Sequence, residues 1–185
     1  MIDVGQKIKI ITFLLILGLI NACNQKSRTE YSDMESLLVE ISKDKIVEFN
    51  KYPPRLVKVF LKFEKSNNDG LIELLEMSEL FIVVHIPKTE NDSLYKYAFD
   101  EVEYHLAQKR HDKIKSIKFE KIIFSEFFHQ KDEGINELIL EIDEPNLYTI
   151  YCLKGNFSRE DIIRVSNIVS PVEFLKLNRK IRRSK

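Results

Sequence analysis

The spacing of hydrophobic residues predicts three helices in the first two thirds of the chain. Ser32 and Glu35 have the spacing of a capping box, and apolar residues recur at helical intervals after them, so we expect a first, interrupted helix over residues 33–49. A short helix is expected over residues 71–77. The clearest apolar stripe predicts a long helix over about residues 93–110.

Two further apolar runs predict strands between these helices. The alternation of apolar and polar residues over 57–63 indicates a half-buried strand. The β-branched run at residues 81–86 is continuous, which is typical of a strand that is covered on both faces.

From about residue 116 the apolar period changes from 3.6 to 2. A long strand is expected to carry Ile117 and Phe127 on one face, with further strands over 138–142 and 147–153. Polar turns at 131–134 and 144–146 join the three strands into an antiparallel meander, and Gly155 is expected to end it.

A last helix follows the meander. Ser158 and Asp161 have capping spacing, and Phe157 can pack on Ile162, so a helix is expected to about Val169. The order of elements predicts the α+β class, with a mostly antiparallel sheet of about five strands and helices packed on one face.

The first 23 residues have the layout of a bacterial lipoprotein signal. Lys7 and Lys9 precede an apolar core of about 11 residues, which is shorter than the roughly 20 that a spanning helix needs. Ile20 and Ala22 before Cys23 resemble a lipobox. This resemblance implies cleavage after Ala22 and acylation of the Cys23 thiol.

These boundaries divide the chain into four parts. Residues 1–22 are expected to be a signal peptide, 23–32 a tether, 33–170 a single domain and 171–185 a basic amphipathic helix or tail. Asn24, rather than an aspartate, stands next to the acylated cysteine. Under the sorting rule of enteric bacteria this favours the outer membrane, with the domain facing the periplasm.

The composition excludes several classes of function. Twenty-nine basic and 29 acidic residues balance, so nothing indicates a nucleic-acid partner. A phosphate-binding loop needs clustered glycines, and a serine hydrolase elbow needs G-x-S-x-G, and the sequence contains neither pattern. We therefore expect no cofactor and no enzymatic activity.

The histidines and the second cysteine are the remaining candidates for chemistry. His85 lies in an apolar strand and needs a hydrogen-bond partner if buried, as a core residue or as a catalytic base. His105 follows Glu101 by one helical turn, as a polarised ligand pair or as a surface ion pair. No zinc-binding spacing is present, and Cys152 is expected to be a buried, inert thiol.

Two charged groups of residues have simple interpretations. The acidic residues between 132 and 144 are expected to form a solvated strand face with polar turns. The basic tail pattern suits either anionic lipid headgroups or a soluble tail whose apolar residues dock on the domain. The basic and acidic sets are Lys176, Arg179, Lys180, Arg182, Arg183 and Lys185, and Asp132, Glu133, Glu137, Glu141, Asp143 and Glu144.

The span from about residue 45 to 169 resembles the small Gram-negative lipoproteins of domain-of-unknown-function family 4252. The resemblance is carried by the strand at 57–63, the helix leading into 81–86, the long helix at 93–110 and the ending at 150–168. It implies an α+β domain in the periplasm and a role near envelope signalling, and it implies no catalytic residues.

Three hypotheses follow for the function. The first is a non-enzymatic envelope lipoprotein, held in the membrane through Cys23, that binds an envelope partner or helps to maintain or sense the envelope. The second is an enzyme or metal-binding protein that uses His85 or His105 with a carboxylate beside solvent. The third is a small-ligand carrier, which requires a closed apolar cavity.

Overall fold

A computed structural model gives the fold of the chain. It describes residues 29–62, 69–89, 92–131 and 134–168, with Leu175 and Arg179. The chain divides after Glu30, and the unit from Tyr31 onward is described below. The signal peptide, Cys23 and most of the basic tail lie outside the described residues.

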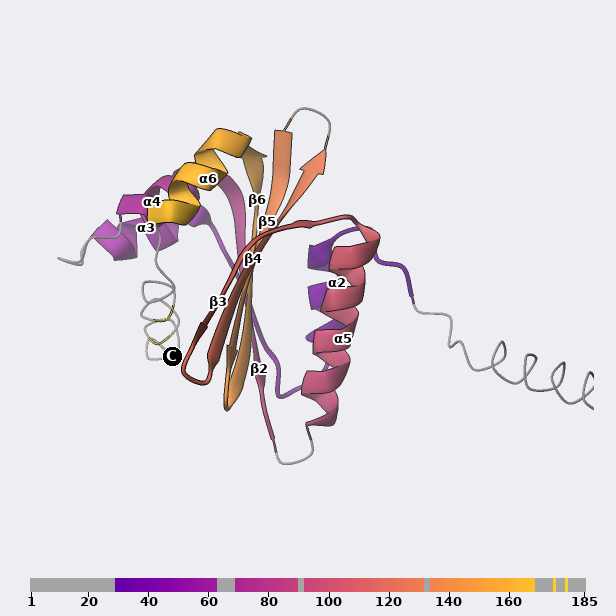
Figure 1. Cartoon of the computed structure of the whole chain (residues 1–185). Coiled ribbons are helices and arrows are strands. Elements are labelled where there is room, and N and C mark those ends of the chain that lie inside the picture. The colour runs from indigo at the N-terminus through magenta and orange to yellow at the C-terminus, as the bar shows by residue number, and fades with distance from the viewer. Residues whose placement is uncertain are drawn as a thin grey trace, which may run out of the picture. The chain divides into compact units, whose positions relative to one another are not determined.

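Six antiparallel strands form one sheet, which Figure 1 shows edge-on. Their order is β1-β2-β6-β5-β4-β3. This confirms the α+β class, with one strand more than the expected number of about five. The strands are β1 (Glu48–Tyr52), β2 (Ser78–Pro87), β3 (Asp112–Phe119), β4 (Ile122–Lys131), β5 (Gly134–Glu144) and β6 (Leu147–Phe157).

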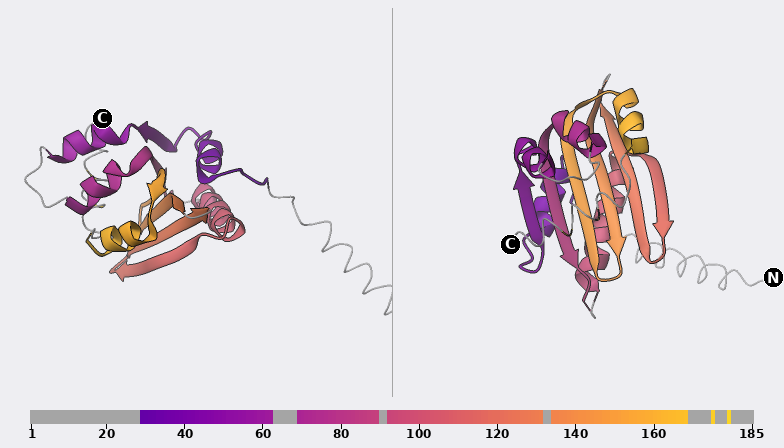
Figure 2. Two further views of the ribbon diagram at one scale, coloured as in Figure 1. Left: turned by 90° about the horizontal axis from the view of Figure 1, so that it is seen from above. Right: turned by 90° about the vertical axis from the view of Figure 1, so that its left-hand side faces the viewer.

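Helices cover both faces of this sheet, so the expectation of one covered face is wrong (Figures 1 and 2). The first face carries α3 (Pro54–Lys62), α4 (Asp69–Glu76) and α6 (Arg159–Ile168); the second carries α2 (Met34–Ile41) and α5 (Ser93–Gln108). The physical reason is that the inner strands are apolar on both sides. On β2, Phe81 and Val83 join the first core cluster, whereas Ile82 and Val84 join the second.

The segment 57–63, predicted as a strand, belongs to helix α3 as far as Lys62. Pro54 is the first helical residue, where its fixed φ favours the helix and its missing N–H costs nothing. Pro54 and Val57 are buried one helical turn apart. Val59, which a strand would bury with Val57, is 48% exposed.

The first helix is shorter than predicted and has a different cap. Asp33, not Ser32, caps α2 by accepting a 2.9 Å hydrogen bond from the Ser36 amide. The helix ends at Ile41, and the chain then forms the edge strand β1, which was not predicted. β1 depends on backbone pairing with β2 more than on its own weak apolar pattern.

The predicted long strand from residue 116 is a hairpin of β3 and β4. Phe119 pairs with Ile122, so Glu120 and Lys121 form a two-residue turn, and Glu120 has a φ of 53°. When the turn residues are charged instead of glycine or asparagine, the alternating pattern does not show where the chain reverses direction.

β6 continues through Gly155 to Phe157, so Gly155 does not end the meander. A Cβ atom at Gly155 would lie 2.4 Å from the Met77 carbonyl oxygen, which explains why glycine occupies this strand position.

Several predictions are confirmed. Residues 81–86 are buried on both faces of β2, and α4 and α5 lie where the apolar spacing placed them. Ser158 caps α6, and its Oγ accepts a 3.0 Å hydrogen bond from the Asp161 amide. In the part of the chain that the structure describes, no helix is both long and apolar enough to cross a bilayer.

Candidate functional site

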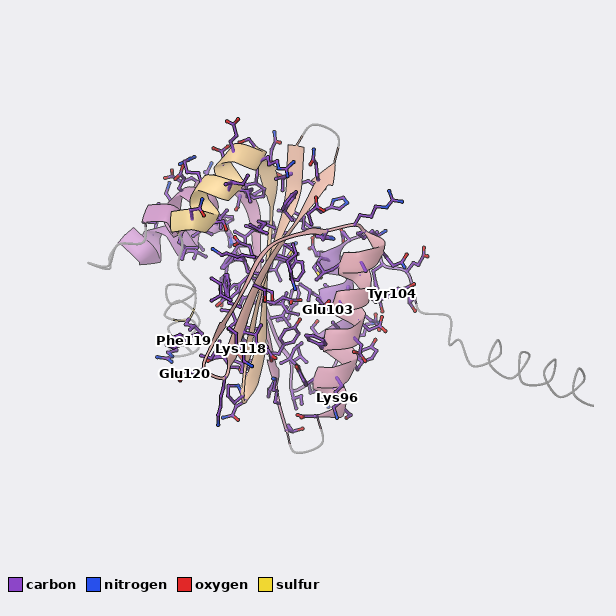
Figure 3. All side chains as sticks on the ribbon, in the orientation of Figure 1. Lys96, Glu103, Tyr104, Lys118, Phe119 and Glu120 are labelled. Carbon is purple, nitrogen blue, oxygen red and sulfur yellow. The ribbon has the colours of Figure 1, made fainter. Side chains whose placement is uncertain are left out.

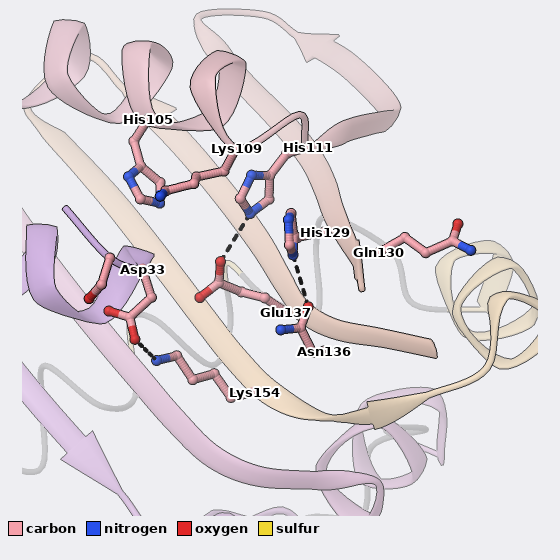
Figure 4. Close-up of a pocket in the computed structure, with 10 residues that line it drawn as sticks. Asp33, His105, Lys109, His111, His129, Gln130, Asn136, Glu137 and Lys154 are labelled. Atoms are coloured by element: carbon pink, nitrogen blue, oxygen red, sulfur yellow. Dashed lines mark hydrogen bonds and ion pairs between the residues drawn. The ribbon is translucent and has the colours of Figure 1, made fainter. Parts of the chain in front are cut away.

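A polar pocket of about 620 Å³ opens at one end of the face that α2 and α5 cover (Figure 4). Its floor is a row of three side chains across adjacent strands. His129 on β4 pairs with Glu137 on β5, and Glu137 pairs with Lys154 on β6. Because paired residues share a face of the sheet, all three point toward the end of α5.

Two further histidines come from the end of α5 and the chain that follows it. His105 lies in the last turn of the helix, and His111 follows a tight reversal in which Arg110 has a φ of 55°. The ring centroids are 6.0 Å apart for His105 and His111, and 5.0 Å apart for His111 and His129. Three imidazoles therefore form one continuous side of the pocket (Figure 4).

Glu137 holds its two oxygens toward protein donors. Its Oε2 lies 3.0 Å from His111 Nε2, and its Oε1 lies 3.7 Å from the Cys152 thiol, which donates to it. An ionised carboxylate only accepts, so His111 Nε2 carries the proton of this hydrogen bond.

A β-bulge brings Asn136 beside His129. The pairing of β4 and β5 shifts between His129 and Gln130, and Asn136 is the extra residue on β5. Asn136 Oδ1 then accepts a 3.0 Å hydrogen bond from His129 Nδ1.

Two ring nitrogens in this cluster are buried without a hydrogen-bond partner among the described residues: Nε2 of His105 and Nδ1 of His111. Such atoms are rare in folded proteins, where an ordered water molecule or an ion often supplies the partner. Burial lowers the pKa of His105 from its usual 6.5 to about 4, so its imidazole is neutral at pH 7.

An ion-pair group closes the other side. Lys154 Nζ lies 2.9 Å from Asp33 Oδ2 and 3.0 Å from Glu35 Oε2, which ties the start of α2 to β6. Partial burial would raise the pKa of Asp33, but hydrogen bonds from Lys154 and Ser36 outweigh it and hold the pKa at about 2. Burial would lower the pKa of Lys154, but its hydrogen bonds to Asp33 and Glu35 outweigh that effect and raise the pKa.

The two histidines selected from the sequence have different positions. His85 is buried and its Nδ1 lies 3.2 Å from Thr149 Oγ1, so the prediction that a core histidine finds a partner is confirmed. His105 is only 4% exposed, so the surface ion-pair interpretation is wrong; the residue lines the pocket instead. Helix α5 lies flat on the sheet, and His105 is on its buried side.

Cys152 is buried, as predicted. Burial and the nearby Glu137 carboxylate raise the pKa of its thiol well above the ordinary value. The thiol donates to a carboxylate instead of an imidazole, which is the opposite of what a nucleophilic cysteine needs.

The acidic residues do not form a solvated face, because Glu137 and Glu141 are about 95% buried beneath α2 and α5. Asp132 and Glu133 lie outside the described residues. Sequence reasoning passed over His111, His129 and Glu137 as site residues. The available signal was that Glu137 and Glu141 alternate with apolar residues in a run whose neighbouring strands are apolar on both faces.

The arrangement favours binding of a polar group over metal coordination. Within the described ranges, no three histidine, cysteine, aspartate or glutamate side chains are placed to hold one metal ion. No known protein family, curated protein or solved structure matches the chain. The chemistry of the pocket is therefore argued from its own residues.

Proposed function

We propose that this protein is an acyl-anchored envelope lipoprotein whose domain is a non-enzymatic binding module, with the histidine pocket as its ligand site. The single observation that carries the binding role is the pair of buried, partnerless ring nitrogens on His105 and His111 at the wall of a polar pocket. A ligand that reaches these atoms, once the rings turn to expose them, would provide the hydrogen bonds that the protein alone does not make.

The anchoring part of the proposal rests on the sequence. The lipobox-like Ile20 to Cys23 supports diacylglycerol attachment at Cys23, and Asn24 supports the outer membrane with the domain in the periplasm. Ser32, which lines the pocket, follows Cys23 by nine residues. A fully extended chain of that length spans about 30 Å, so an anchor at Cys23 would hold Ser32 within this reach of the lipid.

The resemblance to domain-of-unknown-function family 4252 is part of the same proposal. The strand at 81–86 and the helices α5 and α6 lie where this resemblance implies them, although no family model matches the chain. The element at 57–63 does not fit the resemblance, because it belongs to a helix where the resemblance uses a strand.

A polar lining favours a hydrophilic ligand over the apolar cargo of a lipid carrier. The side chains around the pocket are almost all charged, amide or imidazole groups. The apolar residues of the sheet pack into the two core clusters instead. An apolar ligand would leave the polar groups of the pocket desolvated and unpaired.

One observation favours a second candidate, an acid–base enzyme. His111 lies 3.0 Å from Glu137 at the edge of a solvent-open pocket, which is the contact expected for an oriented general base. The nitrogen that would take the proton, Nδ1, is itself buried, so a substrate would reach it only after the His111 ring rotates.

Intact mass tests the anchor. The protein from the membrane fraction of its host is compared with the Cys23→Ser variant. We expect loss of residues 1–22 and the mass of an acylated cysteine in the wild type, with membrane association lost in the variant. An unprocessed chain without added mass would contradict the anchoring part.

Thermal unfolding tests the pocket in the intact, detergent-solubilised protein. The small-molecule fraction of the envelope should raise the melting temperature by a few degrees, because a ligand that binds only the folded state stabilises it. His105→Gln should abolish this shift, whereas Lys96→Gln on the exposed side of α5 should keep it (Figure 3). Equal shifts in both variants would place the ligand elsewhere.

A further inference from the structure

We infer that the histidine pocket binds an oxyanion, a phosphate or carboxylate group, between Lys109 and His105. This inference rests on the proposed binding role of the pocket and names its ligand class. Some polar groups of the pocket are hydrogen-bonded within the protein and others have no partner, and this difference indicates the ligand class.

The two carboxylates of the pocket already accept hydrogen bonds from the protein. Asp33 accepts from Ser36 through Oδ1 and from Lys154 through Oδ2. Glu137 accepts from His111 and from Cys152. Both carboxylates are therefore turned toward protein donors, and little of their charge is left for a cationic ligand.

The groups that are left are mainly donors. Within the described part of the chain, no hydrogen bond or ion pair involves the ammonium group of Lys109. Figure 4 shows its side chain turned toward His105, whose buried Nε2 is partnerless. His105 Nε2 adds a second donor when it carries a proton. A ligand that meets these groups has to be rich in acceptors.

The end of α5 does not prevent this. Carbonyl groups at a helix C-terminus repel anions. Those of His105, Leu106 and Ala107 already accept hydrogen bonds from the backbone amides that follow the helix. The Lys109 ammonium belongs to the residue that ends the helix, and it offsets the remaining partial charge.

The pH dependence of binding distinguishes an anion from a metal ion. An anion beside His105 stabilises its protonated form, so affinity should rise as the pH falls from 7 to 5.5. A metal ion requires the neutral ring, so its affinity should fall over the same range. The charged and titratable groups that face His105 come from α2, α5, the following loop, β4, β5 and β6: Asp33, Lys109, His111, His129, Glu137 and Lys154.

Calorimetric titration of the intact, detergent-solubilised protein with inorganic sulfate tests the inference, because sulfate keeps its charge throughout this pH range. We expect Lys109→Gln to weaken sulfate binding about tenfold, since it removes a charge-assisted hydrogen bond. The matched variant Lys96→Gln, on the same helix but outside the pocket, should bind as the wild type does. His105→Gln should remove the gain in affinity at acid pH.

Two further arms identify the source of the anion. The His105 ring resonance, assigned by its loss in His105→Gln, should shift with inorganic phosphate if the ligand is a free solute. It should shift in bicelles that contain phosphatidic acid, but not in phosphatidylcholine alone, if the ligand is a lipid headgroup. Either shift supports an oxyanion site, provided that Lys109→Gln reduces it.

Three results would overturn the inference: no binding of sulfate or phosphate, equal sulfate affinity in Lys109→Gln and the wild type, or binding of Zn²⁺ alone with affinity that falls at acid pH. A protein that is acylated at Cys23 and stabilised by envelope solutes, yet binds neither anion, would overturn only the ligand class. The anchored binding module would then still stand.

Discussion

At the residue scale, burial imposes an electrostatic cost on Glu141. The side chain points from β5 into the core beneath α5 and is only 4% exposed. Burial raises the pKa of its carboxyl to about 8, although Tyr148 donates a 2.8 Å hydrogen bond to Oε1 and opposes the shift. At neutral pH the folded protein therefore keeps a proton that the unfolded chain releases.

Glu141→Gln should stabilise the domain at pH 7 by about 2–3 kcal/mol, because the amide accepts from Tyr148 and, unlike Glu141, takes up no proton on folding. A raised folded pKa gives stability that is complete below the ordinary value of 4.5 and is lost as the pH rises toward 8. Urea unfolding should therefore show the gain at pH 7 and little difference at pH 4. The exposed Glu79→Gln should change neither value, and a destabilised Glu141→Gln at pH 7 would contradict the argument.

The candidate site shows why single residues could be ranked from the sequence only in part. His85 and Cys152 stand in apolar runs, so their burial followed from their neighbours. His129, Glu137 and Lys154 form one row, yet they are separated by eight and 17 residues. Strand register brings them together, and register depends on the turn geometry and the bulge at Asn136, which no local pattern records.

At the element scale, the backbone restricts which residue fits at two positions, Glu120 and Gly155. Glu120 has a φ of 53° at the first central position of the β3–β4 turn, where a two-residue hairpin favours glycine. Figure 3 shows Phe119 and Glu120 at the tip of this hairpin. Gly155 lies where β6 passes close to the end of α4.

Glu120→Gly should stabilise the protein by about 0.5–1 kcal/mol, because it removes the left-handed strain of a residue with a Cβ atom, partly offset by the greater entropy of the unfolded chain. Lys121 has a negative φ at the second turn position, so Lys121→Gly relieves no strain. It only raises the entropy of the unfolded chain and should destabilise the protein slightly. Thermal unfolding of the two variants gives the comparison. A lower melting temperature for Glu120→Gly than for Lys121→Gly would count against strain at this turn.

Gly155→Ala should destabilise by about 2 kcal/mol or more, because the new methyl group would clash with the backbone carbonyl of Met77, 2.4 Å away. Gly134→Ala provides a matched control. There the nearest atom is the side-chain oxygen of Asn156, at 2.9 Å, which can rotate away. Similar urea midpoints for the two variants would show that the α4–β2 connection yields more readily than this geometry implies.

The elements that were predicted correctly have one unambiguous pattern each. Helix α5 has an apolar stripe of helical period. Strand β2 has a continuous β-branched run, which is typical of a buried strand. Residues 57–62 fit both periods, and Pro54 at the helix start decides between them only when its position in the fold is known. Strand β1 has little pattern of its own, so it could not be found without its partner β2.

At the scale of the whole molecule, the second helical layer changes the meaning of the polar residues. A sheet with one covered face would expose Glu137, Glu141 and His129 to water. Helices α2 and α5 cover that face, so Glu141 is buried, and Glu137 and His129 line the pocket. The chemistry of the domain is therefore a consequence of its three layers.

The same layering predicts a stability maximum in mild acid, between about pH 4.5 and 6.5. The lowered pKa of His105, about 4, gives stability that is present above 6.5 and is lost as the pH falls through 4. Solvent screening through the open pocket limits this contribution to about 1–2 kcal/mol. Glu141 acts in the opposite direction, since its contribution is lost as the pH rises from 4.5 to 8. Asp33 has a pKa of about 2, so its contribution is lost only below 3.8.

Urea midpoints measured from pH 3.5 to 8.5 should thus peak below the isoelectric point, which is near 6.9. His105→Gln should remove the loss below pH 6.5 that opposes the Glu141 effect, so the maximum should move to lower pH while the slope above pH 6.5 stays unchanged. Glu141→Gln should flatten the alkaline side and move the maximum to higher pH. Because the two side chains lie on different elements, α5 and β5, the double variant should combine both effects. A wild-type maximum above pH 7 that neither variant moves would mean that net charge, not these two buried groups, sets the pH dependence.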